Sequence, residues 1–297
     1  MSDALFPGFD HRMIAIDGID LAVTLGGSGP PALLLHGYPQ SSAMWHKIAP
    51  SLAEHRTLII PDLPGYGHSG FPQNDSVEAY SKRATGLLMR ALMEHLGYSR
   101  FHLIGHDRGA RVSYRMALDM PTHLETVAVL DIVPTLAMWD RMTAETAMTV
   151  YHWLFLAQPA PMPETLIGAN PDAYLEHTIA SWTATKDLSS FDDHALEAYR
   201  TAHRDPARIH AMCQDYRAGW FVDRVLDDED LGRGVKIKPP VFALWGETGI
   251  AGKQQGSPKE IWATCCDDLT TKAVQSGHFV CEEAPEATLE GLLDWMV

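Results

Sequence analysis

The feature that most constrains this chain is a strand, a sharp turn and a helix encoded in residues 101–120. A short apolar run stops at Gly105, Asp107 and then Gly109 follow, and a helical pattern begins directly afterwards. The spacing Gly-x-Asp-x-Gly is typical of a strained turn between a buried strand and a helix, where the two backbones leave no room for a Cβ at either glycine. Such a turn lifts Asp107 clear of the sheet and aims it at a helix N-terminus, which favours an ionised carboxylate. We therefore expect Asp107 to act as a nucleophile.

Apolar runs and helical patterns alternate along most of the chain. The predicted strands are Arg12–Ala15, Leu21–Leu25, Ala32–Leu35, Thr57–Ile60, Phe101–Ile104, Val127–Leu130, Pro240–Gly246 and Thr270–Val274. The predicted helices cover about Ser42–Ala53, Val77–Leu96, 108–120, Lys259–Cys265 and the end of the chain from Pro285. An Asp-Gly turn between the first two strands predicts an antiparallel hairpin. The alternation predicts an α/β fold, with a mostly parallel sheet and helices on both faces.

This alternation stops after Pro134. From there to about Gly234 the chain shows helical periodicity only. We interpret residues 135–234 as a helical cap domain, inserted over the carboxyl ends of the strands where ligands bind in open α/β sheets. The core domain then comprises residues 1–134 and 235–297.

Charge and composition limit the partners. The formal net charge of −15 argues against nucleic acid and anionic membranes, and it gives a small anionic substrate no overall attraction. No apolar run reaches the roughly 18–20 residues that cross a bilayer, and the N-terminus lacks the pattern of a signal peptide. Four cysteines without metal-type spacing fit a reducing compartment. We expect a cytoplasmic protein in which locally placed arginines would bind any carboxylate ligand.

Three residues follow the chain order nucleophile, acid and base. They are Asp107, Asp131 at the end of a predicted strand, and His278 near the end of the chain. A carboxylate nucleophile displaces a leaving group from saturated carbon and forms an alkyl ester. Water must then cleave that ester, with His278 as the base and a carboxylate to orient the imidazole.

The whole chain resembles the α/β-hydrolase superfamily. The motifs that carry the resemblance are His36-Gly37-Tyr38-Pro39, Asp62-Leu63-Pro64-Gly65-Tyr66-Gly67-His68-Ser69, Gly105-His106-Asp107-Arg108-Gly109 and Ser276-Gly277-His278-Phe279. More narrowly, a second set of residues resembles the haloacetate dehalogenase family: Asp107, Arg108, Arg111, His152, Trp153 and Tyr216. The resemblance implies an α/β-hydrolase fold with an inserted helical cap.

The resemblance also bears on the acid. In many members of the superfamily the acid follows a later strand, in a pattern like Trp-Gly-x-x-Asp. This chain has Gly249 at that place, so Asp131 is the predicted acid and Glu247 a weaker alternative. The haloacetate dehalogenases also place the acid at the position of Asp131.

Two arginines accompany the nucleophile. Arg108 follows Asp107 directly, and Arg111 lies one helical turn away on the same face. Two guanidiniums beside an anionic nucleophile require another anion, and a substrate carboxylate bound by planar forks is the natural one. Arg115 continues the spacing, and we expect it to be a solvated surface charge. Epoxide hydrolases and haloalkane dehalogenases also resemble this chain, but they usually carry an aromatic residue at position 108.

The remaining roles are implied by the resemblance. His152, Trp153 and Tyr216 would donate hydrogen bonds to the departing halide, because a dry site must replace the water that solvates it. Tyr38 and Arg108 would provide the backbone N–H pair for the oxyanion. Trp182 would line the pocket.

The sequence thus predicts a hydrolytic dehalogenase of short 2-haloacids, which converts fluoroacetate or another haloacetate to glycolate and halide without cofactor or metal. Two alternatives stay open: an epoxide hydrolase with the same Asp–His–Asp machinery, and a ligand receptor on the hydrolase scaffold. The preferred halogen also stays open. The relatives are often homodimers, so a homodimer is possible.

Overall fold

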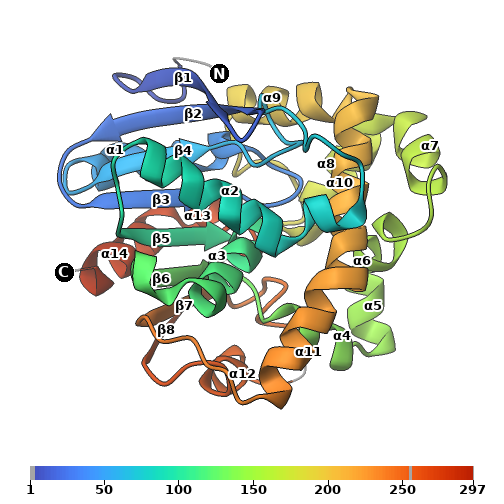
Figure 1. Cartoon of the computed structure of the whole chain (residues 1–297). Helices are drawn as coiled ribbons and strands as arrows, with labels where there is room; N and C mark the ends of the chain where they lie inside the picture. The colour runs from blue at the N-terminus through green and yellow to red at the C-terminus, as the bar shows by residue number, and fades with distance from the viewer. Residues whose placement is uncertain (1–3, 254–255, 297) are drawn as a thin grey trace.

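A sheet of eight strands forms the centre of the structure, a computed structural model that describes residues 4–253 and 256–296 (Figure 1). The strand order is β1-β2-β4-β3-β5-β6-β7-β8. The strands are β1 (Asp10–Ile16), β2 (Ile19–Gly27), β3 (Pro31–Leu35), β4 (Thr57–Pro61), β5 (Phe101–His106), β6 (Leu124–Leu130), β7 (Val241–Gly246) and β8 (Leu269–Val274). β2 pairs antiparallel with β1 and β4, and all other neighbours in this sheet are parallel. The predicted hairpin and mostly parallel sheet are therefore confirmed.

Helices cover both faces of this sheet. On one face, α2 (Lys82–His95) packs beside α3 (Arg108–Asp119), with Gly86 of α2 directly against Met116 of α3. On the other face, α14 (Pro285–Trp295) places Gly291 against Phe242 of β7. Parallel strands covered on both sides must be apolar throughout, and β3, β5 and β6 are almost entirely buried. The fold is the α/β-hydrolase fold that the sequence predicted.

Between β6 and β7 the described chain forms helices and connecting loops, apart from one isolated bridge of Ile237 with Cys266. The helices lie beside the carboxyl ends of the parallel strands in Figure 1. They are α4 (Thr135–Asp140), α5 (Ala144–Thr149), α6 (Tyr151–Leu156), α7 (Met162–Gly168), α8 (Pro171–Trp182), α9 (Asp193–His203), α10 (Pro206–Ala218), the π-helical turn η4 (Gly219–Asp223) and α11 (Arg224–Gly232). The division into a core domain and a separate cap domain stays a prediction.

Two predicted helices are wrong in extent. The segment 42–53 forms a 3₁₀ turn, η1 (Ser42–Trp45), and a short α1 (Ala49–Ala53), because Pro50 can begin a helix but cannot continue one. The segment 77–96 forms a 3₁₀ turn, η2 (Val77–Tyr80), before α2. Ser81 between them is extended and caps α2 through its hydroxyl, which accepts a hydrogen bond from Ala84 N.

The other predicted strands and helices agree with the structure to within a few residues, among them α12 (Pro258–Ala263) and α14. Two short elements were not predicted: the 3₁₀ turn η3 (Pro121–His123) and the helix α13 (Val280–Glu283). No helix among residues 4–253 and 256–296 is long and apolar enough to cross a membrane.

Candidate active site

Asp107 lies between β5 and α3 in a strained turn. Its φ is 45° and its ψ −113°, a conformation that costs about 1–3 kcal/mol for a residue other than glycine. The flanking glycines are sterically required. A Cβ on Gly105 would lie 2.4 Å from Ser113 Oγ, and one on Gly109 would lie 2.2 Å from the carbonyl oxygen of Leu35. In this conformation the Asp107 side chain lies beside the Tyr38 backbone, and Tyr38 N donates a hydrogen bond to its Oδ2 at 3.0 Å.

Asp131 and His278 form a buried pair. Asp131 follows β6, and its Oδ2 lies 2.6 Å from Nδ1 of His278. Backbone N–H groups of Gly246 and Ile250 also donate to this carboxylate, at 3.1 and 3.0 Å. Burial lowers the pKa of His278, but the hydrogen bond and charge of Asp131 more than compensate and raise it above its usual value. Nε2 of His278 has no hydrogen-bond partner among the described residues, so it is free to accept a proton.

The alternative acid, Glu247, does not join this pair. Its exposed carboxylate accepts a hydrogen bond from Gln275 Nε2 instead. At Gly249, where other members of the superfamily carry the acid, a Cβ would lie 2.4 Å from Asp131 Oδ1. Asp131 therefore occupies the space that a side chain at position 249 would need.

The two arginines near Asp107 differ in their partners. Arg111 is 2% exposed, and its Nη1 donates to Val133 O at 3.0 Å and to Thr135 Oγ1 at 3.2 Å. Within the described part of the chain no carboxylate forms an ion pair with it, and its Nε has no partner. Burial lowers the pKa of Arg111, and the charge of Asp107 acts in the opposite direction.

Arg108, by contrast, has a protein anion. Its Nε donates to Asp215 Oδ2 at 2.6 Å, and its Nη2 donates to the backbone oxygen of Asp215 at 2.7 Å. Only Nη1 lacks a partner among residues 4–253 and 256–296. For Arg108, part of the negative charge that the sequence analysis assigned to a substrate carboxylate thus comes from a protein residue, Asp215. The sequence analysis did not predict this role of Asp215. The available signal was its position, because an acidic residue stands directly before the predicted site residue Tyr216.

The environment of Asp107 favours its ionised form. Burial would raise the pKa of this carboxyl, but the charges of His278, Arg111, His106 and Arg108 outweigh burial and lower it. His106 packs against His278 with ring centroids 4.6 Å apart. Asp107 is therefore a carboxylate over the physiological pH range.

Aromatic rings from three helices and one loop pack together, and two of them, His152 and Tyr216, lie within electrostatic range of Asp107. His152 lies 4.3 Å from Trp182 and 5.4 Å from Tyr216 between ring centroids, and Tyr216 lies 6.1 Å from Trp153. Tyr38 lies 5.2 Å from Tyr216. The structure thus brings all of these predicted residues together.

Several polar atoms of this aromatic group have no partner. They are Nδ1 of His152, Nε1 of Trp182 and the hydroxyl of Tyr216, each buried and without a hydrogen bond to any described residue. Burial lowers the pKa of His152 well below its usual value, and burial raises the pKa of Tyr216 well above 10.0. Both groups are therefore neutral hydrogen-bond donors at neutral pH, which suits an anionic ligand.

Arg115 is not the solvated charge that its spacing predicted. It is 1% exposed and forms ion pairs with Asp119 at 3.0 Å, with Asp227 at 3.5 Å and with Asp230. Two of these carboxylates come from α11, far away in the sequence. They neutralise a guanidinium that would otherwise be too costly to bury.

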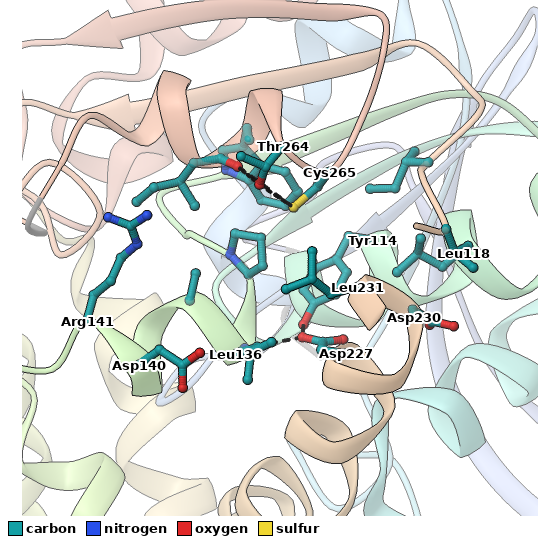
Figure 2. Close-up of a pocket in the computed structure, with 16 residues that line it drawn as sticks. Tyr114, Leu118, Leu136, Asp140, Arg141, Asp227, Asp230, Leu231, Thr264 and Cys265 are labelled. Atoms are coloured by element: carbon teal, nitrogen blue, oxygen red, sulfur yellow. Dashed lines mark hydrogen bonds between the residues drawn. The ribbon is translucent and has the colours of Figure 1, made fainter. Parts of the chain in front are cut away.

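A pocket of about 410 Å³ lies apart from the predicted site, among α3, α4, α11 and α12 (Figure 2). Most of its lining is apolar, and none of the predicted site residues belongs to that lining. At its centre Tyr114 donates to Asp227 Oδ2 at 2.7 Å, and burial raises the pKa of Asp227 to about 6. Among the residues that the structure describes, no group of three or more His, Cys, Asp or Glu side chains could hold a metal ion.

Known proteins resemble the chain over almost its full length. The family model for the alpha/beta hydrolase fold matches residues 30–285. A fluoroacetate dehalogenase of a Burkholderia species is 42% identical over 98% of this chain and 95% of its own. A soluble epoxide hydrolase of Corynebacterium sp. (strain C12) is 30% identical over 95% of this chain and 96% of its own.

Solved structures agree. ALR0039 of Nostoc sp. PCC 7120 is 41% identical, with a TM-score of 0.94 over 98% of this chain and 99% of its own. A Pseudomonas aeruginosa protein, provisionally named an epoxide hydrolase, is 43% identical, with a TM-score of 0.93 over 99% of this chain and 97% of its own. The chain therefore belongs to the α/β-hydrolase family and, within it, resembles fluoroacetate dehalogenase.

Proposed function

We propose that this hydrolase is a dehalogenase of short 2-haloacids. The observation that carries the proposal is Arg111, a buried guanidinium that has no carboxylate partner among the described residues and lies near the ionised Asp107. An unpaired buried charge is costly, so a substrate anion is its natural partner. The Burkholderia relative, named a fluoroacetate dehalogenase, supports the same substrate class.

The reaction has two steps. An Asp107 oxygen attacks the α-carbon of the haloacid, the carbon–halogen bond breaks, and halide leaves with the bonding electron pair. A water molecule then adds to the carbonyl carbon of the resulting ester and gives its proton to Nε2 of His278, while Asp131 stabilises the imidazolium. Collapse of the adduct breaks the bond between the carbonyl carbon and the ester oxygen. The departing alkoxide takes the proton from His278 and becomes the 2-hydroxyacid, glycolate from a haloacetate, and the regenerated Asp107 carboxyl loses its remaining proton to solvent.

Donors around the nucleophile suit both charged groups of the substrate. Arg111 and Nη1 of Arg108 bind the carboxylate and thereby fix the α-carbon in front of Asp107. His152, Trp153 and Tyr216 bind the departing halide, and Trp182 lines the same space. The supporting observation is that His152, Tyr216 and Trp182 present buried polar atoms without partners in the described chain.

The oxyanion of the second step needs donors as well. Tyr38 N already donates to an Asp107 carboxylate oxygen at 3.0 Å, so it lies where negative charge develops. The backbone N–H of Arg108, at the start of α3, is the second proposed donor. We expect the reaction to need neither cofactor nor metal, in which case dialysis against a chelator leaves the rate unchanged.

Trapping the ester tests the proposal. The His278→Ala variant, mixed with chloroacetate or fluoroacetate, should accumulate protein heavier by one carboxymethyl group, and peptide mapping should place that group on Asp107. Protein that stays unmodified, or that still turns over, would contradict the mechanism. Halide release from fluoro-, chloro- and 2-halopropionate then ranks the leaving groups.

An epoxide hydrolase is the second candidate. The Corynebacterium relative favours it, as does the Tyr216 hydroxyl, which has no partner in the described chain and could protonate an opening epoxide. Styrene oxide and chloroacetate, offered to the same preparation, separate the two activities. Binding of haloacetate without any turnover would instead indicate a receptor.

We propose a homodimer from the resemblance and a cytoplasmic location from the four cysteines, which show no metal-type spacing and fit a reducing compartment. Light scattering coupled to size-exclusion chromatography tests the assembly, and cell fractionation tests the location.

A further inference from the structure

A cluster of buried polar and charged side chains, which includes Arg108, surrounds Asp215 of α10. We call it the Asp215 cluster: Tyr66, Lys82, Arg108, Asp215 and Asp223. Asp215 Oδ2 accepts hydrogen bonds from Arg108 Nε at 2.6 Å and from the Tyr66 hydroxyl at 2.9 Å. Its Oδ1 accepts from Lys82 Nζ. Asp223 accepts a hydrogen bond from the backbone N of Lys82 at 2.8 Å, and its other carboxylate oxygen lies 3.9 Å from Lys82 Nζ. Among the described residues Asp223 forms no hydrogen bond or ion pair with Arg108.

Asp215 and two residues that follow it on α10 and η4, Tyr216 and Gly219, hold the guanidinium of Arg108 from several directions. The edge formed by Nε and Nη2 faces Asp215, through both its carboxylate and its backbone oxygen. The ring of Tyr216 lies below the guanidinium, with Cζ 4.2 Å from the ring centroid. Gly219 leaves room for Nη2, since a Cβ there would lie 3.2 Å from that atom. Nη1 lies on the opposite edge of the guanidinium. It is the nitrogen of Arg108 that has no hydrogen-bond partner among the described residues.

The cluster also fixes the charge of Arg108. Burial raises the pKa of Asp215, but the charges of Arg108 and Lys82 outweigh burial and hold it far below its usual value. Arg108 therefore forms a permanent ion pair, whereas Arg111 does not pair with any described carboxylate. Arg111 thus offers a bound anion a positive charge that no described carboxylate neutralises. Arg108 offers it mainly a hydrogen-bond donor, Nη1, in a fixed orientation.

We propose that Asp215 is a positioning residue for substrate binding: it holds the Arg108 fork side-on so that Nη1 is directed at the substrate carboxylate. This inference rests on the proposed function, because it assigns a carboxylate to the free edge of Arg108. Lys82 balances the charge of Asp215 and keeps it an acceptor. A guanidinium fixed in advance loses little entropy when substrate binds.

The test measures ester formation in the His278→Ala background, where the reaction stops after the first step. Intact-mass kinetics against chloroacetate concentration give a half-saturating concentration and a maximal rate. Adding Asp215→Asn should raise the half-saturating concentration at least tenfold and change the maximal rate less. Asp223→Asn is the matched control, because it removes a buried carboxylate that pairs with Lys82 and forms no described hydrogen bond with Arg108. It should change both values less than twofold.

Chloroacetamide separates positioning from general damage. It has no carboxylate, so its slower alkylation of Asp107 should be unchanged by Asp215→Asn. If the amide reaction slows in parallel, or if Asp223→Asn raises the half-saturating concentration equally, Asp215 is only structural and the inference is wrong. If Asp215→Asn does not fold, the double variant Lys82→Met/Asp215→Asn removes the buried pair together and should show the same tenfold rise.

The two proposals fail in different ways. His278→Ala protein with native Asp215 that forms no ester overturns the proposed function. If the Asp215→Asn protein still forms the ester and its half-saturating chloroacetate concentration is unchanged, only the role of Asp215 is overturned.

Discussion

Oδ2 of Asp131 lies 2.6 Å from Nδ1 of His278, and its Oδ1 lies where a side chain at position 249 would have to go. An acidic side chain at position 131 and one at position 249 would therefore compete for the same space beside His278. In this chain Asp131, which directly follows β6, occupies that space. The glycine at position 249 is a steric requirement of that arrangement.

Exchanging the two residues tests the arrangement. Asp131→Gly should lower kcat by about 10³–10⁴, because His278 loses the carboxylate that sets its tautomer. Asp131→Gly/Gly249→Asp should recover at least tenfold of that loss, since glycine tolerates the φ of 50° at position 131 and the new acid enters the vacated space. Steady-state halide release measures both. Glu247→Gln is the control and should stay within twofold of the native rate; a large loss there would point to Glu247 as the acid.

Arg111 and Arg115 lie one turn apart on α3, and replacing each of them by Gln should affect different properties. Arg111→Gln removes the guanidinium that has no described carboxylate partner, so KM for chloroacetate should rise about 10- to 100-fold, the value of one or two charge-assisted hydrogen bonds. Arg115→Gln breaks ion pairs with α11, so it should lower the melting temperature and leave KM unchanged. Kinetics and thermal unfolding of both variants check this. Equal effects on KM would contradict the assignment.

The two chemical steps should depend differently on pH. The pKa of His278 lies above 6.5, and only the neutral imidazole accepts a proton, so ester hydrolysis should fall about tenfold for each pH unit below that pKa. The pKa of Asp107 lies below 3.8, so ester formation should stay constant between about pH 5 and 8. Rapid-quench mass spectrometry of the native enzyme separates the steps, and the ester should accumulate at the acid end. A parallel decline of both rates would exclude this division of roles.

Asp227 should make the stability of the protein depend on pH. Its pKa is raised from 3.8 to about 6 in the folded state, so the folded protein binds this proton more tightly than the unfolded chain. Stability from this group is present below about pH 4 and is lost as pH rises towards 6, by up to about 3 kcal/mol. Urea unfolding of the native protein and Asp227→Asn should therefore give a stability difference that changes between pH 4 and 7. Leu231→Ala, in the same pocket but without a titratable group, should give a constant difference.

The sequence predicted the sheet well because its signals are local. Each buried parallel strand is a short apolar run, and the turn at Asp107 needs glycines at fixed places, which the contacts of Gly105 and Gly109 explain. The break at Ser81 was missed because the apolar period continues through it. What favours the break is Asp223, which accepts from Lys82 N across 141 residues of sequence.

The same limit applies to the site. Spacing placed Arg108 and Arg111 beside Asp107, but it could not show that only Arg108 has a carboxylate partner. Arg115 looked like a surface charge because two of its three acidic partners, Asp227 and Asp230, come from α11 and cannot be read from the helical repeat of α3. Only Asp119, four residues further along α3, is visible in that repeat.

The ring of aromatic side chains around Asp107 has a spectroscopic consequence. Trp182 lies 5.6 Å from His278 between ring centroids, and Trp153 lies against Tyr216. A heavy halide bound between these indoles would quench their fluorescence by promoting intersystem crossing, and fluoride would not. The site would then report its own occupancy, and an iodide titration could be read without any added label.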